Sequence, residues 1–160
     1  MTRVGHGFDA HRLVEGRRLI IGGVRIEFER GALGHSDADV LAHAVSDAVL
    51  GAAALGDLGL HFPDSDERWR GADSMDLLES CVAKLHAAGF RVENVDATVV
   101  LEKPKLAPYV EEMRGLLAAR LGVAADCVGV KAKTSEGMGY TGDGSGIAAY
   151  AVACVVSQAP

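Results

Sequence analysis

The stretch from His35 to Phe62 constrains the fold of this 160-residue chain more than any other. It begins with a dense group of acids, histidines and a serine and continues as a run rich in Ala, Val and Leu. Acidic residues suit a helix N-terminus, because their carboxylates accept hydrogen bonds from free backbone N–H groups and interact well with the helix dipole. The stretch therefore predicts a helix that Ser36 or Asp37 caps and that ends near Gly56.

Polar and apolar residues fall on different faces of this predicted helix. Asp39, His43 and Asp47 are spaced four residues apart, so their side chains lie on one face. The other side carries the residues expected to pack, which are Leu41, Val45, Ala48 and Ala52. We interpret the helix as one that buries one side and presents a polar site on the other.

Length, composition and charge indicate one domain over residues 1–160. The chain is long enough for a substantial core, and its 49% apolar and 24% charged residues are ordinary for a soluble globular protein. A net charge of −6 without a dense basic patch argues against nucleic acid as a partner. We expect no membrane association and a cytoplasmic location, since no long apolar run and no signal-peptide pattern are present.

The three cysteines, Cys81, Cys127 and Cys154, lie far apart in apolar surroundings. They are expected to be buried, reduced thiols rather than a disulfide framework or a metal site.

Hydrophobic periodicity and turn residues predict the remaining elements. In chain order these are a strand at 1–11, a hairpin at 17–26 that turns at Gly22-Gly23, a connection at 27–34, the central helix, a loop at 61–73, a helix at 73–89, a strand at 90–101, a turn at 102–105, a helix at 108–122, a strand at 127–132, a glycine-rich loop at 134–146 and a strand at 147–156. Strands and helices do not alternate strictly. The order therefore favours an α+β fold, with a mixed sheet covered by helices on one face.

One candidate site joins the first strand to the central helix. Asp9 and His11 are two residues apart, so on a strand their side chains point the same way. With His43 they offer three N/O ligands, and three such ligands with an open fourth position are typical of catalytic zinc. Asp39, one turn before His43, is predicted to hold the imidazole in place. The alternative is that all four are capping and surface groups.

A second candidate site runs from Lys133 to Glu136 and is followed by five glycines through Gly146. Hydroxyls, free N–H groups and a carboxylate suit a phosphate with an attached Mg²⁺. The pattern alone favours a simple turn instead, because glycine readily supplies a positive φ. His35, just before the helix, is a further candidate to donate to a phosphate.

Several longer motifs combine these residues. They are GHGFDAH at 5–11, IGGVRI at 21–26, HSDADVLAHAVSDAVLGAAALGDLGLHFPDSD at 35–66, GADS at 71–74, NVDATVV at 94–100, KPKLAP at 103–108 and VKAKTSEGMGYTG at 130–142. Together they cover most of the chain and resemble the 2-C-methyl-D-erythritol 2,4-cyclodiphosphate synthases, enzymes of the non-mevalonate isoprenoid pathway. The resemblance implies an α+β homotrimer with active sites at the subunit interfaces.

The resemblance also implies a substrate and a reaction. The substrate would be 4-diphosphocytidyl-2-C-methyl-D-erythritol 2-phosphate, a cytidine diphosphate derivative. Its 2-phosphate would attack the β-phosphorus and release CMP, which makes the enzyme a phosphorus–oxygen lyase. Elementary chemistry agrees, because an anionic nucleophile needs neutralised charge and enforced proximity rather than a base.

Site residues follow from the same resemblance. It implies Asp9, His11 and His43 as Zn²⁺ ligands, His35 and Thr134 as transition-state stabilisers, and Glu136 as the contact to a second divalent ion, Mg²⁺ or Mn²⁺. It implies substrate contacts at Ser36, Asp57, Leu58, Gly59, Phe62, Pro63, Asp64, Ser65, Asp66, Leu101, Glu102, Lys103, Pro104, Lys105, Leu106, Ala107, Lys133, Ser135, Tyr140 and Asp143. Residues 101–107 would bind cytidine, and Asp57 and Gly59, with residues 62–66, would hold the methylerythritol portion. Asp47 has no assigned role.

The chain departs from the family pattern at Asp143 and Ser145, where many members carry Arg and Glu. In the family this region lines a central channel of the trimer that is proposed to bind isoprenoid diphosphates. An Asp there repels such an anion, so we predict weak or absent binding.

Two rival functions also stay open. One is a metal-dependent phosphohydrolase acting on a nucleotide diphosphate, and the other is a non-catalytic zinc-binding trimer.

Overall fold

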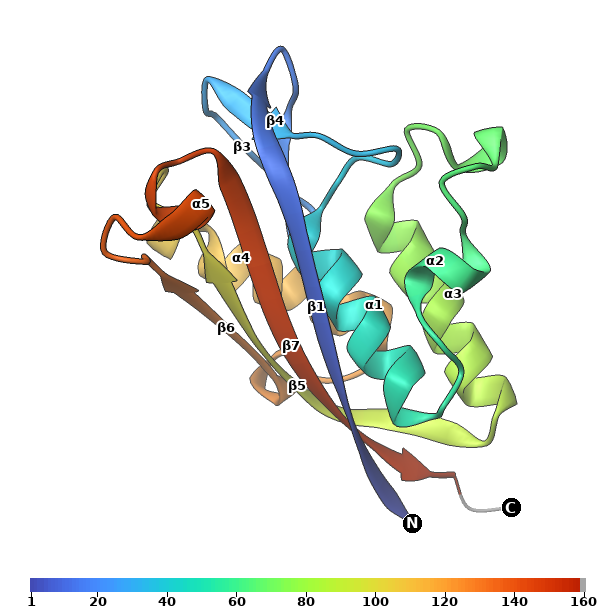
Figure 1. Cartoon of the computed structure of the whole chain (residues 1–160). Coiled ribbons are helices and arrows are strands. Elements are labelled where there is room, and N and C mark those ends of the chain that lie inside the picture. Colours follow the sequence, from blue (N-terminus) through green and yellow to red (C-terminus); the bar gives the residue numbers. More distant parts are fainter. Residues whose placement is uncertain (159–160) are drawn as a thin grey trace.

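The computed structural model describes residues 1–158 and consists of a β-sheet with helices packed on one face (Figure 1). The strands are β1 (Thr2–Glu15), β2 (Leu19–Ile21), β3 (Val24–Ile26), β4 (Arg30–Ala32), β5 (Phe90–Val100), β6 (Val128–Lys133) and β7 (Gly146–Ser157). The α-helices are α1 (Val40–Ala52), α2 (Leu58–His61), α3 (Ser74–Ala87), α4 (Val110–Leu121) and α5 (Gly139–Gly142). Short 3₁₀ turns span Glu67–Trp69, Ala107–Tyr109 and Ala125–Cys127.

Five strands form the main sheet in the order β4-β1-β7-β5-β6, and β2 pairs with β3 in a separate hairpin. Only β5 and β6 run parallel, while the other neighbours in the main sheet are antiparallel. The predicted mixed α+β fold is therefore confirmed. The hairpin turns at Gly22 and Gly23, whose φ angles of 59° and 78° are costly for other residue types.

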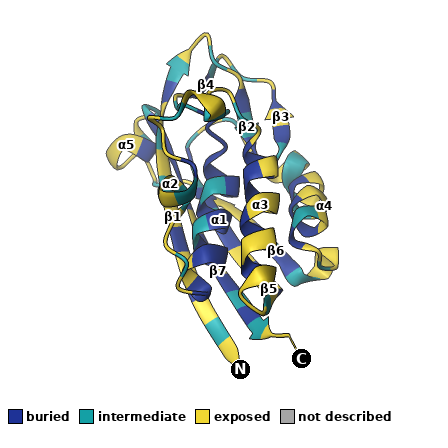
Figure 2. Ribbon diagram, turned by 90° about the vertical axis from the view of Figure 1, so that its right-hand side faces the viewer, coloured by how far each residue is buried: buried dark blue, intermediate teal, exposed yellow. Residues whose placement is uncertain are grey.

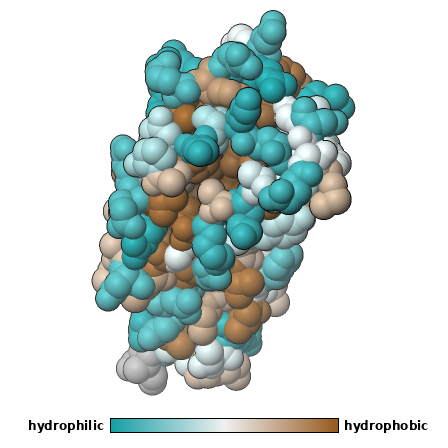
Figure 3. All heavy atoms as spheres, turned by 90° about the vertical axis from the view of Figure 1, so that its left-hand side faces the viewer, coloured by the Kyte–Doolittle hydropathy of each residue, from teal (hydrophilic) through white to brown (hydrophobic). Residues whose placement is uncertain are grey.

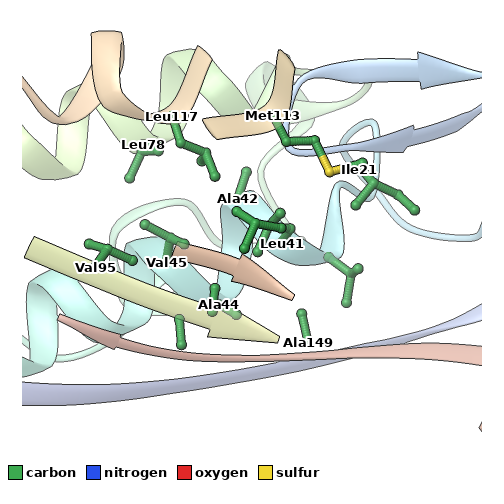
Figure 4. Close-up of a cluster of buried hydrophobic side chains, with 14 of the residues drawn as sticks. Ile21, Leu41, Ala42, Ala44, Val45, Leu78, Val95, Met113, Leu117 and Ala149 are labelled. Carbon is green, nitrogen blue, oxygen red and sulfur yellow. The ribbon is translucent and has the colours of Figure 1, made fainter. Parts of the chain in front are cut away.

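Helix α1 lies between the sheet and α3, and Figure 2 shows it almost entirely buried. Core side chains pack against α1 both from the sheet and from α3 and α4. Figure 4 shows Val45 of α1 near Val95 of β5, with Leu78 of α3 and Leu117 of α4 on the helical side. Burying large aliphatic side chains of this kind stabilises the fold by roughly 1.5–3 kcal/mol each.

The predicted start of α1 was wrong. Its N-cap is Asp39, whose carboxylate accepts hydrogen bonds from the backbone N–H groups of Leu41 and Ala42. Ser36 and Asp37 instead accept hydrogen bonds from residues two positions ahead, in the turn before the helix. The helix also ends at Ala52, earlier than predicted. Capping rules identify the type of residue that can cap a helix, and Ser36, Asp37 and Asp39 all satisfy them. Only the tertiary contacts show that Asp39 is the cap.

Other differences are additions inside predicted loops. Strand β4 lies within the predicted connection at 27–34, a 3₁₀ turn lies within the loop at 61–73, and α5 lies within the glycine-rich loop. Strand β1 continues to Glu15 because β4 pairs with its last three residues. Such short elements depend on a partner strand or on a few local hydrogen bonds, and they have little periodicity of their own.

All three cysteines are free, but only Cys81 is fully buried, whereas Cys127 and Cys154 are partly exposed. The expectation that all three are buried was therefore wrong for two of them. Burial raises the pKa of the Cys81 thiol from 9.0 to about 12, which keeps it protonated and unreactive at neutral pH.

Within residues 1–158, the structure contains no helix with both the length and the apolar character needed to cross a membrane.

Candidate functional site

Three side chains from β1 and α1 converge on one point. Asp9 Oδ2 lies 2.8 Å from His11 Nε2 and 2.9 Å from His43 Nδ1, and the two ring nitrogens are 3.3 Å apart. Ligands about 2.0–2.1 Å from a tetrahedral zinc ion lie roughly 3.3 Å from one another, close to these spacings. The structure thus contains a candidate metal-binding site of one carboxylate and two imidazoles.

Glycines in β1 bring the three residues together. Side chains of a strand alternate between its faces, so Gly5 and Gly7 face α1 as Asp9 and His11 do. A Cβ atom at Gly5 would overlap the carbonyl oxygen of Ala48, and one at Gly7 would overlap that of Ala44. The absence of side chains at these positions allows α1 to approach β1 closely enough for His43 to reach Asp9.

Hydrogen bonds assign the free nitrogen of each imidazole. His11 Nδ1 lies 2.9 Å from the carbonyl oxygen of Leu33, which can only accept, so Nδ1 carries the hydrogen. Nε2 of His11 therefore presents a lone pair to Asp9. His43 presents Nδ1 to the same point, and its Nε2 bonds to the hydroxyls of Ser74 and Ser36 at 2.8 and 3.2 Å. Lone pairs that converge in this way suit a bound cation.

The ionisation of Asp9 and His43 reflects their mutual contact. Burial acts to raise the pKa of Asp9, but hydrogen bonds and positive charge from the protonated rings of His11 and His43 outweigh it and lower the pKa from 3.8 to about 2. Burial acts to lower the pKa of His43, and the hydrogen bond and charge of Asp9 raise it overall. Asp9 is therefore an anion at neutral pH, as a metal ligand must be.

Asp39 does not hold the imidazole of His43, so that prediction was wrong. Its fully buried carboxylate accepts hydrogen bonds from the backbone N–H groups of Gly22 and Gly23, at 2.8 and 2.7 Å, as well as capping α1. Burial raises its pKa to about 6. Asp39 thus fastens the β2–β3 hairpin to the start of α1, a role that required knowledge of tertiary contacts.

Arg17 shapes the loop that carries His35. Its guanidinium donates hydrogen bonds to the carbonyl oxygens of Ala32, Gly34 and Ser36, at 3.0 to 3.1 Å. The fixed fork of donors in arginine suits such a set of acceptors. No sequence pattern distinguishes Arg17 from Arg18 beside it, and sequence reasoning missed this residue.

A pocket of about 400 Å³ opens beside the three candidate ligands. It is lined by Asp9, His11, Leu33, Gly34, His35, Ser36, His43, Asp47, Asp57, Leu58, Gly59, Phe62 and Asp64. Most of the residues predicted to hold the methylerythritol portion therefore lie next to the candidate metal site. Pro63, Ser65 and Asp66 do not line this pocket, and the carboxylate of Asp66 binds Arg68 instead.

Asp47 connects α1 to the substrate turn. Its Oδ1 accepts a hydrogen bond of 2.7 Å from the backbone N–H of Leu58, while Asp57 caps the short helix α2. Burial raises the pKa of Asp47, and the charges of Asp57 and Asp9 add to this effect. The residue left without a role by the sequence thus supports the turn at 57–59.

Most of the remaining predicted contacts line a separate pocket of about 190 Å³ at the ends of β5 and β6. It is lined by Leu101, Glu102, Pro104, Lys105, Leu106, Ala107, Ala132, Lys133 and Thr134. Glu102 accepts a hydrogen bond from the backbone N–H of Ser135, and Thr134 donates one to Glu136. This pocket therefore combines the predicted cytidine-binding and phosphate-binding segments.

Within one chain the two pockets lie apart. Asp9 pairs with Ala149 of β7, which pairs with Val99 of β5, which pairs with Ala132 of β6. Three strand spacings amount to roughly 14 Å. Tyr140 lies in a third pocket, of about 220 Å³, beside His11 and Ser145, and Lys103 lines none of the pockets described above.

Comparison with known proteins identifies the family. The family model of the YgbB family matches residues 2–156. The chain belongs to the YgbB family. Among the similar members of the YgbB family is a curated protein of Burkholderia lata named 2-C-methyl-D-erythritol 2,4-cyclodiphosphate synthase. It is 60% identical over 156 residues, which are 98% of this chain and 97% of that protein.

Solved structures agree with this assignment. A structure of 2C-methyl-D-erythritol-2,4-cyclodiphosphate synthase superposes with a TM-score of 0.89 at 40% identity, over 96% of this chain and 100% of that chain. A CDP-bound form of such a synthase gives a TM-score of 0.88 at 39% identity, with the same coverage. The YgbB family therefore includes members whose fold matches this chain and which bind a cytidine nucleotide.

Proposed function

We propose that this chain converts 4-diphosphocytidyl-2-C-methyl-D-erythritol 2-phosphate into 2-C-methyl-D-erythritol 2,4-cyclodiphosphate and releases CMP. The observation that carries the proposal is the convergence of Asp9, His11 and His43 beside a pocket, in a chain 60% identical to a synthase of that name. A carboxylate with two neutral imidazoles leaves one tetrahedral position open for a substrate oxygen.

The charged residues around the pocket suit the reaction. Zn²⁺ held by Asp9, His11 and His43 would supply a Lewis acid for a phosphate oxygen. His35 lines the pocket and its Nε2 donates a hydrogen bond of 3.1 Å to the carbonyl oxygen of Asp66, which orients the ring. As an imidazolium, the ring would donate to a phosphate through Nδ1. Glu136 would hold a second divalent ion, Mg²⁺ or Mn²⁺, and Thr134 would then turn the hydroxyl hydrogen that it gives to Glu136 in this structure toward the developing charge.

The second pocket supports binding of the cytidine group. Lys133 and Lys105 provide positive charge there, and the CDP-bound relative shows that a synthase of this fold holds a cytidine nucleotide. Because CMP is the leaving group, contacts to cytidine supply binding energy away from the bond that breaks.

We also propose a homotrimer in which the metal pocket of one subunit meets the cytidine pocket of the next. Two observations support it: the separation of the pockets, and the apolar character of the uncovered sheet face. Val4, Phe8, Tyr150 and Val152 point outward from β1 and β7 and are 43–67% exposed. Figure 3 shows hydrophobic groups gathered on this side of the molecule. A repeated head-to-tail contact between the same two faces forms a ring when its rotation closes, as a threefold rotation does.

The activity is tested by incubating the purified protein with the substrate, Zn²⁺ and Mg²⁺, and by analysing the products in water enriched in ¹⁸O. We expect CMP and a cyclic diphosphate without ¹⁸O. His43→Ala should abolish turnover, and His86→Ala, a change of an exposed histidine on α3, should leave it intact.

Incorporation of ¹⁸O into the products would instead identify a phosphohydrolase. Zinc binding without turnover of the substrate would identify a non-catalytic zinc protein.

A further inference from the structure

His43 has two hydroxyl neighbours on the side of its ring that faces away from Asp9. Its Nε2 lies 2.8 Å from Ser74 Oγ and 3.2 Å from Ser36 Oγ. Ser74 is completely buried and Ser36 is 8% exposed, so water does not compete for these contacts. Ser74 comes from the first turn of α3, an element that contributes no residue to the candidate metal site.

The carboxylate of Asp37 determines how these hydrogen bonds run. It accepts a hydrogen bond from the hydroxyl of Ser74 through Oδ1 and one of 3.1 Å from the Ser74 backbone N–H through Oδ2. A serine hydroxyl has a single hydrogen, and Asp37 binds it. Ser74 Oγ must therefore accept from His43, which places the hydrogen of the neutral ring on Nε2 and leaves the Nδ1 lone pair free.

From this chain of hydrogen bonds we infer that Ser74 and Asp37 are positioning residues for His43. They hold its ring in the tautomer and orientation that present Nδ1 to the metal. The inference rests on the proposed metal site. Partners of this kind behind a ligating histidine raise its basicity and typically change metal affinity 10- to 100-fold.

Capping of α3 does not account for the arrangement. The N-cap of α3 is Asp73, whose side chain accepts a hydrogen bond from the backbone N–H of Met75. Ala38 has a φ of 58°, which is uncommon for a residue with a side chain, and it separates Asp37 from Asp39. One carboxylate thus points to α3 while the other points to the β2–β3 hairpin. A strained residue that directs two acids to different partners is typical of a functional site.

The inference is tested by measuring Zn²⁺ affinity of the metal-free protein in competition with a chromophoric chelator. Ser74→Ala should weaken Zn²⁺ binding about 10- to 100-fold. Ser74→Thr keeps the hydroxyl and should restore affinity to within about threefold of the parent. Asp37→Asn should fall between these values, because a neutral amide orients the hydroxyl less strongly.

Ser46→Ala is the matched control. Ser46 is also fully buried, and its hydroxyl donates to the backbone oxygen of Ala42 within α1 rather than to His43. This variant should bind Zn²⁺ as the parent does. The absorption bands of bound Co²⁺ provide a second measurement, and they should shift in Ser74→Ala and stay unchanged in Ser46→Ala.

Two results separate this inference from the proposed function. If Ser74→Ala and Asp37→Asn bind Zn²⁺ as tightly as the parent, with unchanged Co²⁺ spectra, the positioning role is overturned whatever the activity. If the parent binds Zn²⁺ without cyclising the substrate and Ser74→Ala still weakens binding, the role stands and the proposed function fails. Should Ser74→Ala not fold, the Asp37→Asn measurement decides.

Discussion

At the scale of single residues, the candidate metal site depends on the tautomers of His11 and His43, which their hydrogen-bond partners determine. Leu33 fixes the hydrogen of His11 on Nδ1, and Ser74 fixes that of His43 on Nε2. Asp9 then faces two lone pairs in a space of about 3 Å, an arrangement that a cation or a proton must stabilise. In the metal-free protein, protons on the two rings take the place of the cation and donate to Asp9, which lowers its pKa.

Acid should remove the stabilisation that Asp9 provides. Its pKa is about 2 in the folded protein and 3.8 in the unfolded chain, so the folded state loses this proton more readily. The resulting contribution of about 2 kcal/mol is present above pH 4 and is lost as the pH falls toward 2. In urea unfolding of the metal-free protein, the stability difference between the parent and Asp9→Asn should shrink by that amount between pH 5 and about 2.5.

Asp64→Asn provides the comparison, since Asp64 lines the same pocket and is exposed to solvent. This control measures the effect of removing an exposed carboxylate from the same pocket. A constant difference between the parent and Asp9→Asn across this range would contradict the prediction.

At the scale of elements, the distance between β1 and α1 controls the site. Strand β1 contributes two candidate ligands and α1 contributes the third, so the metal site exists only if the strand and helix backbones nearly touch. Gly5 and Gly7 make that approach possible. In the motif GHGFDAH, the glycines that let α1 pack closely therefore directly precede the two candidate ligands of β1.

Gly7→Ala should separate β1 from α1 and weaken metal binding together with stability. The added Cβ would overlap the Ala44 carbonyl, which no side-chain movement can relieve. Overpacking of this kind costs about 1–3 kcal/mol, and the shift moves His43 away from Asp9. Thermal unfolding and Zn²⁺ titration measure the two effects.

Gly115→Ala is a suitable control, because Gly115 lies on an exposed part of α4 with open space around it. An alanine there should leave Zn²⁺ binding unchanged and stabilise the protein by about 0.5–1 kcal/mol. Full Zn²⁺ affinity in Gly7→Ala would show that the close approach of α1 is not needed.

At the scale of the whole molecule, the two pockets and the uncovered sheet face bear on whether several copies of the chain form one active site. The metal pocket and the cytidine pocket are separated by the width of the sheet, yet the proposed substrate carries both groups that they would bind. The proposed homotrimer would resolve this, since a head-to-tail contact brings different pockets together.

Mixed oligomers test this proposal directly. His43→Ala and Lys133→Ala should each be inactive alone, because one lacks a metal ligand and the other lacks a cation of the cytidine pocket. When the two variants are unfolded together and refolded, about a quarter of the sites should combine an intact half from each subunit and regain activity.

Recovery should disappear with Tyr150→Glu in both chains, a change that places charge on the apolar sheet face, and sedimentation should then show monomers. Absence of recovery in oligomers of confirmed mixed composition would contradict shared sites.

The sequence was sufficient for several features of this protein. Alternation and periodicity predicted the long strands, α1, α3 and α4, because their residues fall on distinct faces that a core must bury. The spacing of Asp9 and His11 and the polar face of α1 predicted the candidate metal site, since both depend on regular backbone geometry. The family motifs predicted the membership that the comparison establishes.

Tertiary structure decided the rest. The sequence predicts that Asp39 holds the imidazole of His43, because the two residues share a helix face. In the structure, two backbone N–H groups of a distant hairpin donate to its carboxylate instead. Arg17, Ser74 and Asp37 act through partners far along the chain, and no local pattern encodes such contacts. The short elements β4, α2 and α5 form only where packing supports them. The stretch from His35 to Phe62 thus supplies the candidate ligand His43. Contacts with residues outside the stretch, such as Asp9 and Ser74, determine how its ring is held.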